Sequence, residues 1–452
     1  MKKFILIILM TSCIKVVNNI DIKDKDMNEE LVQAIIDNNT DKAISLINEG
    51  ANINYSSNEK SIIDIALDNN NLEIIKILIE KNVEINKNNI TKIYSLALDD
   101  FNYDIIDLIK DKYKLEDILI DKNRYFLLLC YIADLEEVKK FLKENNIDPN
   151  EARDELNRNA LIISGAGNKK DTFEMLVMEY KLDVNHKTYL GVTPLIAAAN
   201  VNNKELIEFI IERGANVNNK DNESWTALML ASHNGYMEIV RLLLEKSINI
   251  NDKNNDGYNA LTLASQNGHK DVVKLLLEKG ANVNDKNEEY WTALMVASQK
   301  GHTEVVKLLI EKGANVNDKN EENWTALMMA SQKGHKDVVK LLIEKEANVN
   351  HKNEKKMTAL IIASLKGHID VVKLLLKAGA NVNDKNNNDY TSLMLASEKG
   401  HIEIVKLLME SGSNVNDKQN EDWTALMLAS QKGHVKVVKL LLEKGANING
   451  KK

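Results

Sequence analysis

Proline, phenylalanine and cysteine are scarce in this chain of 452 residues, which has 2, 6 and 2 of them respectively. Two cysteines exclude a scaffold held by many disulfides, and two prolines exclude a Pro-rich linker between domains. Positive charge is not in excess either, because 59 Lys and Arg face 67 Asp and Glu for a net charge of −8. A general nucleic-acid binder is normally basic, so no nucleic-acid partner is expected.

Apolar material is plentiful, at 44% hydrophobic residues beside 28% charged residues. This balance is sufficient for a buried core and argues against disorder along the whole chain. A chain of this length ordinarily folds as two to four globular domains, but the composition is more uniform than separate domains would give.

The amino terminus has the pattern of an export signal. Lys2 and Lys3 precede an apolar run from Phe4 to Met10, and small residues follow. A positively charged start, a short apolar run and small residues are typical of a signal peptide. The run is too short to cross a bilayer as a helix, which takes about 20 residues.

The end of this signal, Leu9-Met10-Thr11-Ser12-Cys13, resembles the lipobox of bacterial lipoproteins, although Met10 stands where that family usually has leucine. The resemblance implies that residues 1–12 are removed and that Cys13 becomes the lipidated first residue. Loss of two lysines would take the net charge from −8 to −10. Residues 13–27 would then be a solvated tether. The alternative is an ordinary secretory signal, with a periplasmic or secreted soluble product.

Most of the remaining chain repeats one pattern. The segment Trp225–Ser232 recurs with its Thr or Asn at positions spaced by 33 residues, namely 226, 259, 292, 325, 358, 391 and 424. A glycine, an apolar stretch and a loop such as Gly280–Lys286 follow each copy. Weaker copies centre on Ala198, Ser164, Leu129, Ala97, Ala66 and Ala34. The pattern predicts thirteen units from about Asn28 to Asn449.

These residues resemble the ankyrin-repeat family, whose pattern is kept at Thr193-Pro194-Leu195, Gly301-His302 and Gly313–Asn317. The family's proline is replaced by Ala or Ser in the last seven units. The resemblance implies an all-α solenoid of about thirteen helix-turn-helix units, joined by β-turn or hairpin finger loops. It divides the chain into divergent repeats over 28–220, repeats close to the family consensus over 221–449 and a tail over 450–452.

The physics of one unit agrees with that fold. Thr226 supplies an oxygen that caps a short helix, Asn259 does the same where Thr is lost, and Gly235 allows the left-handed geometry that ends a helix. Helices of about ten residues are unstable alone in water. Stacking on neighbouring units must therefore supply the stability.

We find no pattern typical of catalysis, metal binding or a cofactor. Six histidines (269, 302, 335, 368, 401 and 434) occur one to a unit, so they are expected at the turn between helices and not around one ion. The methionines at 229, 295, 328, 394 and 427 are expected in the core. Asp252–Gly257 begins like a calcium loop, but the twelfth position is Leu263. Cys130 lies in an apolar run and is expected to be buried and inert.

A row of aromatic residues marks the candidate binding surface. In ankyrin repeats the position before the capping residue borders a concave groove, and all four tryptophans of the chain are at that position. Aromatic residues are enriched at binding hot spots. The predicted partner-binding residues are this row and a polar-basic row on the first helices: Trp225, Tyr258, Trp291, Trp324, Tyr390, Trp423, Gln299, Lys300, Gln332, Lys333, Gln431 and Lys432. The alternative is that each aromatic packs on the neighbouring finger and stiffens it.

The sequence therefore suggests a module that binds a protein partner, not an enzyme, and no small-molecule substrate. We expect it to be exported to the cell envelope and anchored to a membrane through lipid on Cys13. Two rival hypotheses are a structural scaffold or spacer in the envelope and an effector that acts on another cell.

Overall fold

The computed structural model describes residues 27–99, 103–110, 112 and 121–448. The predicted signal peptide 1–12, Cys13, the tether up to residue 26 and the tail 450–452 lie outside these residues. The chain divides into two compact units, one ending at Asp183 and the other starting at Val184.

The first unit contains a short antiparallel hairpin and paired helices. Residues 27–36 are helical. In the hairpin, Ser56 pairs with Ser61 and Ser57 pairs with Lys60. The elements that follow residues 27–36 are α2 (Thr40–Glu49), β1 (Ser56–Ser57), β2 (Lys60–Ser61), α3 (Ile62–Asp68), α4 (Leu72–Glu80), α5 (Lys87–Asp99), α6 (Tyr103–Lys110), α7 (Lys122–Ile132), α8 (Leu135–Asn145), α9 (Ala160–Ala166) and α10 (Lys170–Met178).

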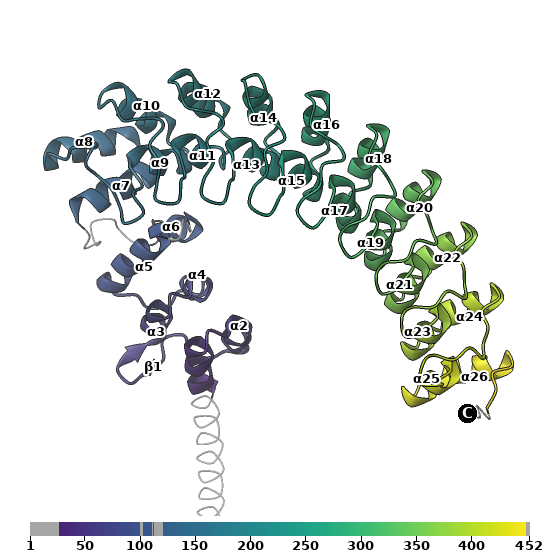
Figure 1. Cartoon of the computed structure of the whole chain (residues 1–452). Helices are drawn as coiled ribbons and strands as arrows, with labels where there is room; N and C mark the ends of the chain where they lie inside the picture. Colours follow the sequence, from purple (N-terminus) through teal and green to yellow (C-terminus); the bar gives the residue numbers. More distant parts are fainter. Residues whose placement is uncertain (1–26, 100–102, 111, 113–120, 449–452) are drawn as a thin grey trace, which may run out of the picture. The chain divides into compact units, whose positions relative to one another are not determined.

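The second unit repeats one helix pair along its whole length (Figure 1). Its helices are α11 (Pro194–Ala198), α12 (Lys204–Glu212), α13 (Ala227–Asn234), α14 (Met237–Leu244), α15 (Ala260–Gln266), α16 (Lys270–Glu278), α17 (Ala293–Lys300), α18 (Thr303–Glu311), α19 (Ala326–Lys333), α20 (Lys336–Glu344), α21 (Ala359–Lys366), α22 (Ile369–Lys377), α23 (Ser392–Glu398), α24 (Ile402–Glu410), α25 (Ala425–Gln431) and α26 (Val435–Glu443).

Successive pairs of the second unit stack in register. Each first helix, such as α15 or α17, packs on the first helix of the next pair, and each second helix packs on the next second helix. The described residues hold five pairs in the first unit and eight in the second, thirteen in all. The all-α solenoid that the repeat predicted, with its number of units, is confirmed.

The first helices begin and end as their sequence predicted. The Thr226 hydroxyl oxygen accepts the Met229 N–H at 3.2 Å, and the Asn259 side-chain oxygen accepts the Thr262 N–H at 2.9 Å. Gly235 closes α13 in the left-handed region with φ 76°. These caps satisfy N–H groups at the start of a helix and carbonyl groups at its end that have no partner inside it.

The core repeats with the units. The methionines at 229, 295, 328 and 394 are about 1% exposed, which confirms them as core residues, and Cys130 is buried as expected. Met427, in the last pair, is half-buried. The core of each pair is therefore completed by the pair that follows it.

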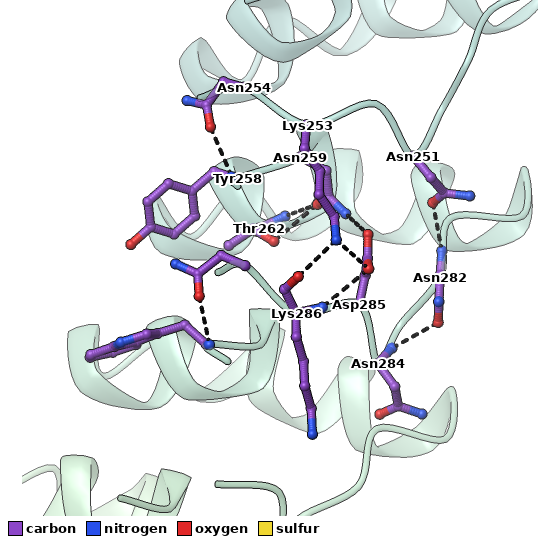
Figure 2. A network of polar contacts seen from close by, with 12 residues as sticks. Asn251, Lys253, Asn254, Tyr258, Asn259, Thr262, Asn282, Asn284, Asp285 and Lys286 are labelled. Carbon is purple, nitrogen blue, oxygen red and sulfur yellow. Dashed lines mark hydrogen bonds and ion pairs between the residues drawn. The ribbon is translucent and has the colours of Figure 1, made fainter. Parts of the chain in front are cut away.

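Two hydrogen-bonded rows join the loops of successive pairs (Figure 2). In one row, the side-chain oxygen of Asn251 accepts the Asn282 N–H at 2.9 Å, and the Asn282 oxygen accepts the Asn284 N–H at 3.1 Å. In the other, the Lys253 ammonium lies 2.8 Å from the Asp285 carboxylate and donates to the Lys286 carbonyl at 2.7 Å. The Asn251–Asn282 bond and the contacts of Lys253 join neighbouring pairs and so fix the spacing between units, whereas the Asn282–Asn284 bond holds the loop that receives them.

Candidate functional site

Five of the six predicted aromatic residues exchange two hydrogen bonds with the residue four positions earlier, whereas among the described residues the finger of Trp423 has only the bond from the Gln419 N–H to the Trp423 carbonyl. In the finger that carries Trp291, the Trp291 N–H donates to the Asn287 side-chain oxygen at 2.8 Å, and the Asn287 N–H donates to the Trp291 carbonyl at 3.0 Å. Figure 2 shows the equivalent bond from the Tyr258 N–H to the Asn254 side-chain oxygen. A residue in the left-handed region comes just before the aromatic, as at Tyr290 with φ 63°. The backbone at the aromatic position is thus fixed before any partner binds.

The aromatic side chains of this row are neither buried nor fully exposed. Each of the six predicted aromatics, Trp225, Tyr258, Trp291, Trp324, Tyr390 and Trp423, is half-buried. Trp225 meets the ring of His233 edge-on, with ring centroids 6.1 Å apart and planes at 83°. Each of these side chains therefore packs in part on the protein and leaves part of its surface open to a partner.

Trp291 and Trp324 line a common cleft of about 120 Å³ between neighbouring pairs. Its other lining residues are Gln299, Asn320, Glu322, Met329 and Gln332. The structure therefore brings together four of the predicted binding residues: Trp291, Trp324, Gln299 and Gln332. They come from two successive fingers and from the ends of α17 and α19.

The remaining predicted residues do not line this cleft. Lys300 and Lys333 are exposed at the ends of α17 and α19. Gln431 and Lys432 are exposed in the last pair. Trp225, Tyr258, Tyr390 and Trp423 have the corresponding place in other fingers. Their role in binding stays a prediction.

The backbone carbonyl of each glutamine in the cleft accepts a hydrogen bond from a histidine of the next pair. His335 Nε2 donates to the Gln299 carbonyl at 2.9 Å, and His368 Nε2 donates to the Gln332 carbonyl at 3.0 Å. The His368 ring packs directly on Gly334, where an added Cβ would lie 2.6 Å from Nδ1. The predicted structural role of these histidines at the turn between helices is confirmed.

Three residues of the cleft were not predicted from the sequence. Asn320 is 9% exposed and accepts the Trp324 N–H at 2.8 Å, while Met329 is 2% exposed on α19. Glu322 lies at the fingertip and is exposed. Asn320 could have been found from the asparagine four residues before most of the aromatics. Nothing in the sequence singles out Met329 from other apolar core positions.

The fingers place negative charge near the aromatics. Burial raises the pKa of the Tyr258 hydroxyl, and the carboxylates of Glu289 and Asp256 raise it further. Burial likewise raises the pKa of the Asp221 carboxyl, although N–H groups of Trp225 and Glu223 donate to it. The fingertips of this face are therefore acidic around a row of half-buried rings.

The first unit has a larger and more polar depression of about 390 Å³ beside the β1–β2 hairpin, lined in part by Asp64, Asn86 and Asn89. The Asp64 carboxylate accepts the Ser61 N–H at 3.0 Å in the capping box of α3, which gives this side chain a structural role, and Glu59 and Glu84 also line the depression. Among the described residues, no group of His, Cys, Asp and Glu has an arrangement suited to a metal ion. None of the helices in the described part is long and apolar enough to cross a membrane.

Comparison with known families decides the assignment of the fold. A family model described as ankyrin repeats (3 copies) matches residues 126–221, 195–287, 281–353 and 360–452. The chain belongs to the ankyrin-repeat family. Ankyrin repeats are generally protein–protein interaction modules and typically form scaffolds without catalytic activity.

Among solved structures, the chain is similar to the human ASB11 ankyrin repeat domain, with 27% identity and a TM-score of 0.46. The similarity covers 49% of this chain and 99% of that one. No curated protein matches the chain.

Proposed function

We propose that this ankyrin solenoid is an exported, lipid-anchored module that holds a protein partner along the groove bordered by its aromatic row. The observation that supports it most directly is the cleft between Trp291 and Trp324. Half-buried aromatics on a fixed backbone are good anchors, because little side-chain freedom is lost when a partner covers them.

The contacts around the cleft favour a surface organised before binding. The side-chain oxygens of Asn287 and Asn320 accept the backbone N–H groups of the two tryptophans. His335 and His368 donate to the backbone carbonyls of the two glutamines. The side-chain amides of Gln299 and Gln332 then offer hydrogen bonds next to the aromatic rings. A protein segment has both the apolar and the amide groups that such a surface would recognise.

Affinity capture with the full chain tests this proposal. The wild type should retain a partner from its own cells, and the double variant Trp291→Ala/Trp324→Ala should not. Trp225→Ala/Trp423→Ala, which removes two tryptophans of the same row outside the cleft, measures how much of the capture depends on the rest of the row. Unchanged capture by the cleft variant, with a large fall in its melting temperature, would mean that the tryptophans only stiffen the fingers.

The lipid anchor on Cys13 is a separate part of the proposal and rests on the lipobox-like sequence. Metabolic labelling with a palmitate analogue should mark the wild-type protein and not Cys13→Ser. Equal labelling of both, or none of either, would remove the anchor from the account. That result would favour the rival hypothesis of an effector that acts on another cell.

The spacer hypothesis predicts a different response to length. Deletion of residues 292–324 removes one complete repeat and places the finger of Trp291 next to the finger that carries Met357. A spacer would tolerate the loss, whereas a groove that matches a partner in register would bind it weakly. Retention of full affinity by the deletion variant would therefore favour the spacer.

A further inference from the structure

Lysine and aspartate side chains form a row of ion pairs between successive loops of the second unit. In each pair, the ammonium group of one loop lies close to the carboxylate of the next. The nitrogen–oxygen distances are 3.0 Å for Lys220–Asp252, 2.8 Å for Lys253–Asp285, 3.1 Å for Lys286–Asp318, 2.8 Å for Lys352–Asp384 and 3.9 Å for Lys385–Asp417.

This row is interrupted at one place between Lys220 and Asp417. His351 occupies the position where the aspartate partner of Lys319 would stand. The His351 ring instead donates through Nε2 to the Asn323 carbonyl, in the finger of Trp324, at 3.0 Å. Lys319 makes no ion pair with any residue of the described part, and it is exposed where Lys253 and Lys286 are half-buried. One cation of the row is therefore left without its carboxylate.

The interruption lies beside the tryptophan cleft. Lys319 pairs through its backbone with Thr325 at the base of the finger that carries Trp324. The next residue, Asn320, lines the cleft. The unpaired ammonium group and Trp324 thus belong to the same finger.

We propose that Lys319 receives the carboxylate of an aspartate or glutamate side chain of the protein partner, while a neighbouring apolar side chain of that segment enters the cleft between Trp291 and Trp324. This inference rests on the proposed function, and it narrows the partner to a segment with an acidic residue. The partner's carboxylate would supply the charge that Asp285 or Asp318 supplies to the other lysines.

Charge complementarity selects an acidic residue over a basic one at this point. Glu322 on the cleft and the neighbouring Glu321 are exposed and face solvent at the fingertip, so they would attract a cation there. The base of the finger offers the opposite sign, through Lys319. The expected segment is therefore oriented, with its acid towards the base of the finger.

A phage-displayed library of random peptides, selected on the full chain, tests the inference. Wild type should enrich peptides with Asp or Glu near an aromatic or aliphatic residue. For a synthetic peptide from that selection, Lys319→Gln should weaken binding about fivefold at low salt, since exposed ion pairs contribute up to about that much. Lys312→Gln, which removes an exposed lysine at the end of α18, should leave affinity unchanged.

A second variant separates the ion pair from the general charge. His351→Asp restores the missing aspartate and gives Lys319 a partner within the chain. The affinity of this variant for the peptide should therefore be as low as that of Lys319→Gln. The losses in the double variant should not add, because both changes remove the same cation from the surface. Replacement of the peptide's acid by its amide should weaken binding to wild type but not to Lys319→Gln.

Equal weakening of wild type and Lys319→Gln by the amide peptide would overturn the inference and leave the cleft in place. Selected peptides whose binding survives Trp291→Ala/Trp324→Ala would instead overturn the proposed function itself.

Discussion

Gly334 offers a direct test of how the cleft is supported. It ends α19 two residues after Gln332, with φ +78°, and the His368 ring packs where a Cβ would lie. Gly334→Ala would place a methyl group 2.6 Å from His368 Nδ1, which is closer than atoms of this kind can approach. The ring would have to move, and its hydrogen bond to the Gln332 carbonyl at 3.0 Å would be lost.

The magnitude follows from two separate costs. An alanine in the left-handed region costs about 1 kcal/mol relative to glycine. Displacement of the ring and loss of one part-buried hydrogen bond add about 1–2 kcal/mol. The expected loss in the free energy of unfolding is therefore about 2–3 kcal/mol.

Gly313→Ala is the matched control. Gly313 has a similar φ of +92°, but nothing lies within 4 Å of its added Cβ, so only the backbone cost of about 1 kcal/mol applies. Urea unfolding followed by circular dichroism would measure both variants. Equal losses at the two glycines would refute the idea that histidine packing on glycine supports the cleft.

Two further predictions concern the contacts between and within units. Ser298 is completely buried and its hydroxyl has no partner among the described residues, so Ser298→Ala should raise the free energy of unfolding by about 1 kcal/mol. The control is Ser430→Ala, which should give no gain because the Ser430 hydroxyl donates to the Leu426 carbonyl at 2.7 Å. A loss of stability in Ser298→Ala, measured by urea unfolding, would show that this hydroxyl is paired. Asn317→Ala removes the acceptor of the Asn348 N–H at 2.8 Å and should cost about 1 kcal/mol in the same assay, and an unchanged midpoint would contradict a stabilising role for the asparagine row.

The sequence predicted the architecture well because the fold repeats with a period that is visible in the residues. Thr226 and Asn259 cap helices as their chemistry indicates, and Gly235 ends a helix as expected. The first unit was harder to predict, since its copies keep only apolar spacing. The 13-residue α5 and the β1–β2 hairpin are features that this spacing does not specify.

The candidate site could be predicted only in part. The row of tryptophans is visible in the sequence, but the cleft between two of them depends on how Asn320 and Met329 pack when units stack. The row of ion pairs could not be predicted from the sequence either, because Lys253 and Asp285 become neighbours only in the stacked solenoid. The substitution of His351 for an aspartate has meaning only once that row is known.

The most direct test of the central claim is the affinity of the captured partner for wild type and for Trp291→Ala/Trp324→Ala, measured by isothermal titration calorimetry. We expect Kd to rise at least about tenfold, since truncation of aromatic hot spots commonly costs more than 1 kcal/mol each, while the melting temperature stays close to that of wild type. An unchanged Kd in a variant that remains folded would contradict the claim that this cleft binds the partner.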